Sequence, residues 1–153
     1  MRRVADSLEE LAATLWVGGL WAVGYLAVPV LFASLSENKP LAGVLAGKLF
    51  VVMAWVGLVC AAYLLLVMAW RLQGRLLRRA GLWIILAMAG ATMAQLWWIY
   101  PTMTGLKEAV APVDVMESGL RERFVFWHGI SSVLYLVQSM LGFSFLNWRR
   151  GAR

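Results

Sequence analysis

The chain has 153 residues, of which 62% are hydrophobic and 14% are charged, and its mean hydropathy is +0.75. This composition is far from that of a soluble domain and indicates a membrane protein. A single membrane crossing uses roughly 20 apolar residues, so a chain of this length leaves no room for a soluble catalytic domain beside several crossings.

Four apolar stretches are long enough to cross a bilayer, at about residues 11–35, 41–70, 80–103 and 124–148. None of them contains Asp or Glu, and most charged residues lie between them, because charge at bilayer depth is costly. The sequence therefore predicts an all-α fold: one four-helix transmembrane bundle that spans residues 1–153 as a single domain.

Two local signals concern the first span. Ser7 and Glu10 have the spacing of a capping box, which predicts that the helix starts near Ser7. Pro29 has no backbone N–H and leaves the carbonyl of Tyr25 without its usual partner, so a kink is expected there. Acidic residues stand between the N-terminal arginines and a long apolar run, which favours a retained span over a cleaved signal.

The distribution of basic residues predicts the orientation. Nine of the fourteen lie in the N-terminus, the 71–79 connection and the tail: Arg2, Arg3, Arg71, Arg75, Arg78, Arg79, Arg149, Arg150 and Arg153. Short basic loops remain cytoplasmic, so both termini and the 71–79 connection are expected inside, with Lys39 and Asp114 outside, in a bacterial inner membrane. The basic charge then indicates membrane lipids as partners and requires no nucleic acid.

The connection 104–122 is the longest of the predicted external segments. It is interrupted by Gly105, Pro112 and Gly119, and its apolar residues recur loosely at helical spacing. Two interpretations remain open: a short helix along the membrane interface, or a solvated loop.

Polar residues in the fourth span recur at steps of three and four, which places them on one face of a helix. They are His128, Ser131, Ser132, Tyr135, Gln138, Ser139 and Gly142. Since polar groups at membrane depth need partners inside the bundle, this face is expected to look inward.

The other spans offer matching surfaces. The third span carries Thr92, Gln95 and Thr102. The second span carries a track of small residues, Gly43, Gly47, Ala54, Gly57 and Ala61. The first span carries Thr14, Gly18, Tyr25 and Pro29. Glycines allow close approach between membrane helices, so Gly18, Gly43, Gly47 and Gly57 are predicted packing positions.

The inward polar residues have two interpretations. One is helix packing through hydrogen bonds. The other is a polar pocket that binds a small solute, an ion or a lipid headgroup, because an ionisable side chain at membrane depth is a candidate for function. Its predicted lining is His128, Ser131, Ser132, Tyr135, Gln138, Gln95 and Tyr25. His128 is also only about one turn beyond Arg123, so an interfacial histidine without a pocket is the alternative.

The sequence gives little support for an enzyme or a metal protein. With one histidine and no carboxylate inside the spans, it has no catalytic triad, zinc ligand set or phosphate loop. Cys60 is expected to pack in an apolar run, and the methionines have no repeated ligand spacing. We therefore predict no catalytic residue, no metal and no cofactor. Most of the nine tryptophans are expected in interfacial belts.

Three runs of sequence resemble a known family. They are Leu15–Trp21 continuing through Ala27–Phe32, then Ala42–Phe50, and finally Phe124 with Trp127–Ser132 and Tyr135. Together they are similar to the bacterial integral-membrane family called domain of unknown function 4149 and, more weakly, to the transmembrane protein 205 group. This resemblance implies a four-span fold without an established activity, and it draws attention to His128, Ser131 and Ser132.

A weaker similarity links the Trp16–Gly19 run to the first helix of copper-resistance D proteins, which implies a metal function. Those proteins carry additional histidines in their spans, whereas this chain has one.

Three functions follow from these observations. The favoured one is an inner-membrane protein that binds or transports a small solute or lipid through a pocket centred on His128. The alternative is a structural or accessory subunit that packs against a larger membrane complex through Gly43 and Gly47. A homo-oligomer is also possible as the assembly. Copper or haem handling is the third.

Overall fold

The computed structural model describes residues 2–72, 80–111 and 114–151. Several residues used in the sequence predictions lie outside these ranges, namely Arg75, Arg78, Arg79, Pro112 and Arg153. The side chains of Arg2, Arg3 and Arg150 are likewise not described. The elements of the described part are all helical, which confirms the predicted fold class.

Four long helical rods make up the described part of the chain, and each is long and apolar enough to cross a membrane, which confirms the four predicted spans. The first rod consists of α1 (Arg2–Ala22), the π-helical turn η1 (Val23–Ala27) and α2 (Val28–Ser34). The second is α3 (Lys39–Leu72). The third consists of α4 (Ala80–Ala94), the π-helical turn η3 (Gln95–Ile99) and α5 (Tyr100–Glu108). The 3₁₀ turn η4 (Val115–Glu117) precedes the fourth rod, α6 (Arg121–Gly151).

Two helix ends differ from the prediction. The first helix begins at Arg2, so the predicted start near Ser7 is wrong: Ser7 lies inside α1, which extends before the apolar run. The third rod continues to Glu108, so the first part of the predicted 104–122 connection belongs to α5. Within the rest, Asp114 caps η4 by accepting a 2.8 Å hydrogen bond from the backbone N–H of Met116.

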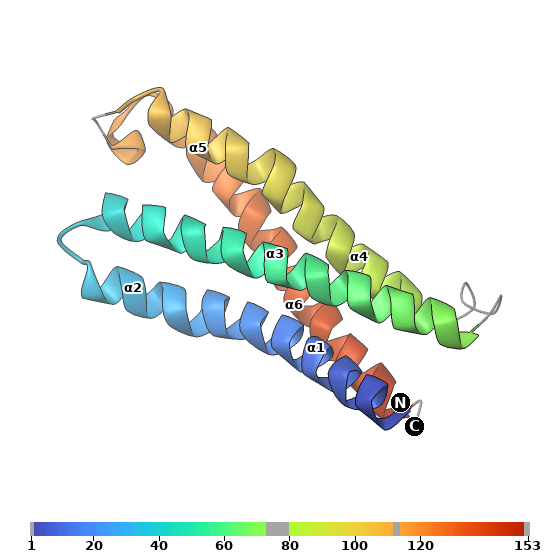
Figure 1. Cartoon of the computed structure of the whole chain (residues 1–153). Helices are drawn as coiled ribbons and strands as arrows, with labels where there is room; N and C mark the ends of the chain where they lie inside the picture. The colour runs from blue at the N-terminus through green and yellow to red at the C-terminus, as the bar shows by residue number, and fades with distance from the viewer. Residues whose placement is uncertain (1, 73–79, 112–113, 152–153) are drawn as a thin grey trace.

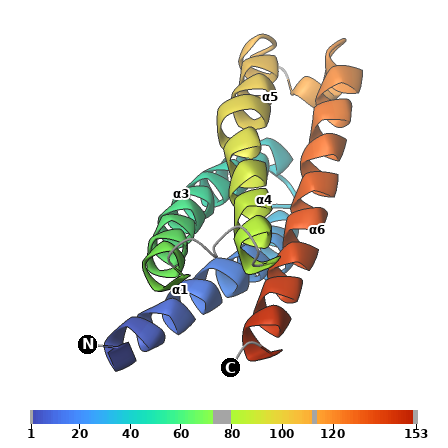
Figure 2. The ribbon, with the colours of Figure 1, turned by 90° about the vertical axis from the view of Figure 1, so that its right-hand side faces the viewer.

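The rods form two hairpins, α1–α2 with α3 and α4–α5 with α6 (Figures 1 and 2). The two ends of the chain lie at the same end of the bundle, which we call the terminal end. The connections after α2 and after α5 lie at the opposite end, which we call the loop end. The closest packing joins α1 to α3, α4 to α6 and α3 to α4.

The hydrophobic core lies toward the terminal end. It consists of Ala13, Trp16, Val17, Cys60, Ala61, Leu64, Ile85, Met88, Ala89 and Phe145. By contrast, neither α2 nor α5, at the loop end, contains a buried residue. Trp16 is only 1% exposed, so this tryptophan belongs to the core and not to the interfacial belt predicted for most of them. The buried core cluster thus lies toward the terminal end, whereas the buried residues at the loop end, among them Ala42, Ile99 and Val115, lie outside that cluster.

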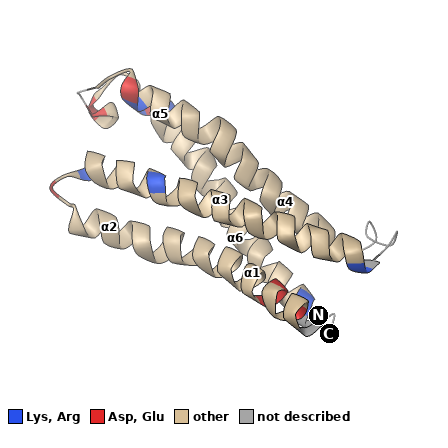
Figure 3. Cartoon of the chain, viewed as in Figure 1, with Lys and Arg blue, Asp and Glu red and all other residues tan. Residues whose placement is uncertain are grey.

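Charged residues gather at the two ends of the rods (Figure 3). At the terminal end, Arg71 of α3 lies 2.5 Å from Asp6 and 3.5 Å from Glu9, both on α1. Arg149 of α6 lies 3.6 Å from the same Glu9 carboxylate. Glu9 therefore joins three helices at the end where the core is also best packed.

The predicted glycine positions have different surroundings. A Cβ on Gly57 would lie 2.5 Å from the indole nitrogen of Trp16, and one on Gly47 would lie 3.2 Å from the ring of Tyr100. A Cβ on Gly43 would lie 3.5 Å from Nζ of Lys107. Side chains from α1 and α5 thus lie against the glycines of the α3 track. At Gly18 a Cβ meets nothing within 4 Å, so the predicted close packing is not found there.

Candidate functional site

A buried amide network joins the third and fourth rods. Gln95 donates a 3.0 Å hydrogen bond from Nε2 to Oε1 of Gln138. Gln138 in turn donates to Oγ1 of Thr92 at 2.7 Å and to the carbonyl of Met88 at 3.4 Å. Gln138 and Thr92 are each 3% exposed. Both donor hydrogens of the Gln138 amide and its oxygen are therefore satisfied, as burial in a membrane protein requires.

A second network joins the first and fourth rods through hydroxyl groups. Tyr25 donates a 3.0 Å hydrogen bond to Oγ of Ser139, which donates at 2.9 Å to the carbonyl of Tyr135. The hydroxyl of Tyr135 donates to the carbonyl of Leu20. The indole N–H of Trp21 donates to the carbonyl of Ser139 at 3.4 Å. This network joins two side chains of the first rod, Trp21 and Tyr25, to one turn of α6, Tyr135–Ser139.

The two π-helical turns position these networks. Tyr25 lies in η1 and Gln95 in η3, and they bond to Ser139 and Gln138, which are consecutive on α6. Each π turn is followed by a helix with a proline near its start, Pro29 or Pro101. Proline lacks the N–H that closes an α-helical turn, and a π turn accommodates the missing bond by shifting the pairing by one residue. A kink is predicted near Tyr25 from the sequence, and the structure has a π turn, Val23–Ala27, at these residues.

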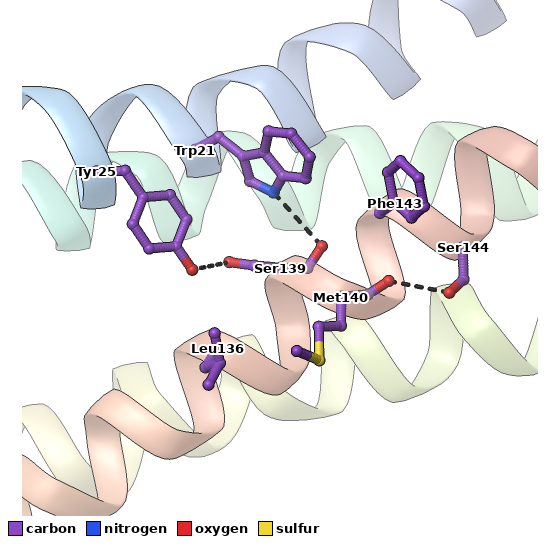
Figure 4. A pocket seen from close by; sticks show the side chains of 7 residues that line it. All are labelled: Trp21, Tyr25, Leu136, Ser139, Met140, Phe143 and Ser144. Carbon is purple, nitrogen blue, oxygen red and sulfur yellow. Dashed lines mark hydrogen bonds between the residues drawn. The ribbon is translucent and has the colours of Figure 1, made fainter.

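A groove of about 430 Å³ lies beside the second network, between the first rod and α6 (Figure 4). Its lining consists of Trp21, Tyr25, Leu136, Ser139, Met140, Phe143 and Ser144. Most of these side chains are substantially exposed, from 40% for Trp21 to 62% for Met140. The groove therefore opens sideways from the bundle, toward the lipid in a membrane. Its lining residues lie within the first and fourth candidate membrane spans, away from the ends of the first.

The structure brings together only part of the predicted pocket. Gln95 and Gln138 meet in one network, and Tyr25 and Tyr135 meet in the other. The hydroxyl of Ser132 donates a 2.9 Å hydrogen bond to the backbone carbonyl of His128. Ser131 is half-buried, whereas His128 and Ser132 are exposed.

His128 does not face the bundle interior, so that prediction is wrong. Its ring stacks on Phe124 with the centroids 6.1 Å apart, and no hydrogen bond of the imidazole is found in the described part of the chain. The physical reason is incomplete cover: at the loop end α6 packs against α5 and η4, and these short elements cover only part of its polar face. The polar face of α6 is buried mainly from Gln138 onward.

The first rod also departs from the prediction. Thr14, Gly18, Tyr25 and Pro29 were expected on its inward face, but all of them are exposed. The buried face consists of Ala13, Trp16, Val17 and Leu20. Sequence reasoning missed Trp21 as a groove residue and missed the backbone carbonyls of Leu20 and Met88 as acceptors, because carbonyls leave no signal in a sequence.

The polar groups of the site are amides, hydroxyls and an indole. In the described residues, no group of three or more His, Cys, Asp or Glu side chains is placed to hold a metal ion. The hydrogen-bond donors and acceptors of this arrangement are suited to binding and to holding helices together.

These features define the class of protein: a multi-pass membrane protein built as a bundle of four helices, with a hydrogen-bonded polar centre. Residues 11–111 match the model of the family described as Domain of unknown function (DUF4149), and the chain belongs to that family. This agrees with the resemblance seen in the sequence, although the match ends before α6 begins. No match is found among curated proteins or among solved structures.

Proposed function

We propose that this protein is a membrane-embedded binding protein for a lipid or lipid-like small molecule, which it holds in the groove between the first rod and α6. The observation that carries the proposal is the groove itself: a shallow depression of about 430 Å³, open to the side, with hydroxyl groups in its wall and with lining residues that lie within two candidate membrane spans. Aromatic and aliphatic side chains line most of it, which suits an apolar chain.

The ligand class, a lipid or small molecule, is the one predicted from the sequence, but the proposed binding site is the groove and not the predicted pocket around His128. The predicted centre, His128, does not line this groove, whereas Tyr25 does. We further propose that the protein lies in a bacterial inner membrane with both termini cytoplasmic, since its basic residues favour that orientation.

Photo-crosslinking tests this function directly. Protein in phospholipid vesicles would be exposed to a long-chain lipid that carries a diazirine in the middle of its chain, and the labelled peptides would be mapped. Labelling is expected to concentrate on residues 136–144 of α6 and on Trp21 and Tyr25. Uniform labelling of all exposed faces would contradict the proposal.

A matched pair of variants controls this experiment. Ser144→Phe fills the groove, whereas Val133→Phe adds the same ring at a position on α6 that is 63% exposed and outside the groove. Ser144→Phe should remove the preferential labelling, and Val133→Phe should leave it unchanged. Equal labelling in both variants would show that the groove is not the binding site.

A second candidate function is a subunit of a larger membrane assembly, and one observation favours it. Thr14, Gly18 and Ala22 form a row of small exposed residues on α1, and a Cβ at Gly18 meets nothing within 4 Å. Rows of this kind allow close approach of another membrane helix. Purification in a mild detergent distinguishes the two functions: a stoichiometric partner that is lost in Gly18→Leu supports the subunit.

A further inference from the structure

In the wall of the groove, the donor and the acceptor of each hydrogen bond can be assigned from the contacts. Ser139 donates to the carbonyl of Tyr135, and a carbonyl can only accept. The hydroxyl hydrogen of Ser139 is therefore used, and Tyr25 must donate its own hydrogen in the 3.0 Å contact with Ser139. Figure 4 shows this contact at the wall of the groove.

The remaining donors of the groove are also engaged. The indole N–H of Trp21 donates to the carbonyl of Ser139, and the hydroxyl of Ser144 donates to the carbonyl of Met140 at 3.0 Å. Backbone N–H groups within the helices are used in helical hydrogen bonds. Each side-chain donor that lines the groove thus has an acceptor within the protein.

The hydroxyl oxygens, in contrast, keep capacity to accept. A phenolic or serine oxygen that donates one hydrogen still has lone pairs, and Tyr25 is 49% exposed at the groove edge. Ser139, only 5% exposed, lies beneath it. A molecule in the groove therefore meets acceptors and aromatic surface, with no free side-chain donor.

We propose that the ligand carries a hydroxyl donor on a long apolar chain, and that it donates this hydrogen to the oxygen of Tyr25. This inference rests on the proposed function and adds the chemical class of the ligand: an alcohol, and not a ketone, an ether or an ester whose oxygen could only accept. At hydrocarbon depth such a hydroxyl has no water to bond, so the Tyr25 oxygen distinguishes the alcohol from its close analogues.

Competition against the diazirine lipid tests this ligand class. Hexadecanol and hexadecyl methyl ether have the same chain, but only the alcohol can donate. Hexadecanol is expected to suppress labelling of residues 136–144 at a concentration about threefold to tenfold lower than the ether does, which is the range of one neutral hydrogen bond.

Two variants locate the discriminating group. Tyr25→Phe removes the acceptor and should bring the ratio of the two competitors to about one. Ser139→Ala releases the Tyr25 hydrogen, which can then be donated to either competitor, so the ratio should again approach one. Tyr63→Phe removes a phenol outside the groove and should keep the wild-type ratio. If Tyr25→Phe does not fold, the ratio of the two competitors in the wild type and in Ser139→Ala still tests whether the ligand donates to Tyr25.

The outcomes separate this inference from the proposed function. Equal competition by the alcohol and the ether in the wild type, or stronger competition by the ether, overturns the hydroxyl inference while the groove remains a binding site. If neither compound competes and Ser144→Phe labels as the wild type does, the proposed function fails, and this inference fails with it.

Discussion

The side-chain nitrogen of Gln95 lies 3.0 Å from the side-chain oxygen of Gln138, which joins the π turn of the third rod to the buried face of α6. One residue further along α6, Ser139 accepts from Tyr25 in the π turn of the first rod. Both rods that contain a π turn therefore contact the same turn of α6. Together the two contacts tie the first, third and fourth rods to one another at a single level of α6.

The amide of Gln138 should contribute measurably to stability. Gln138→Ala removes the partner of Gln95 and Thr92 and leaves a space in a buried site, so we expect the free energy of unfolding to fall by about 1–3 kcal/mol. Asn147→Ala is the control, because Asn147 is exposed and bonds within its own helix, to the carbonyl of Phe143. Denaturation in mixed micelles would measure both. Equal stability of Gln138→Ala and wild type would show that the network is energetically neutral.

Two glycines should respond in opposite ways to a methyl group. A Cβ at Gly57 would be 2.5 Å from the Trp16 indole, and Trp16 is fully packed. We expect Gly57→Ala to lower the free energy of unfolding by about 1–3 kcal/mol. Gly18→Ala enters open space and should be neutral, or stabilising by up to about 1 kcal/mol through helix propensity. Thermal unfolding of the two variants checks this contrast, and a larger loss at Gly18 would contradict the packing described for α1.

The number and approximate limits of the spans could be predicted because the cost of burying charge in a bilayer acts on every residue of the sequence. The inward face of α6 was predicted correctly for Gln138 and wrongly for His128. Helical spacing identifies a common face, but it does not tell where neighbouring helices stop covering it. At the loop end α6 packs mainly against the short elements α5 and η4, and the same face passes from buried to exposed.

The candidate site was harder to predict, for two physical reasons. The π turns rotate the residues after them relative to a regular helix, so Tyr25 could not be placed by a period of 3.6. In addition, several partners are backbone carbonyls, such as those of Leu20 and Met88. The small-residue track on α3 could be recognised from its spacing, but the side chains that lie against it, Trp16, Tyr100 and Lys107, come from α1 and α5. Which side chains lie against this track depends on the tertiary structure and cannot be predicted from the spacing of its small residues.

The carboxylate of Glu9 should hold the terminal end together. It lies 3.5 Å from Arg71 and 3.6 Å from Arg149, and its side chain is only 16% exposed. We expect Glu9→Gln to lower the free energy of unfolding by about 0.5–1.5 kcal/mol, with a smaller difference at high salt. Glu117→Gln, an exposed position in η4, should change it by less than about 0.5 kcal/mol. A salt-independent effect would show that the loss arises from packing and not from charge.

The orientation in the membrane can be tested with single cysteines at the two ends of the bundle. In a Cys60→Ala background, Val4→Cys introduces a thiol near the start of α1, where Val4 is 63% exposed, and Glu37→Cys introduces one at the exposed loop end. Because basic segments remain cytoplasmic, an impermeant maleimide added to intact spheroplasts should label Glu37→Cys and leave Val4→Cys unlabelled. Permeabilisation should make both reactive, which controls for accessibility. Labelling of Val4→Cys alone before permeabilisation would reverse the predicted orientation and place the termini outside.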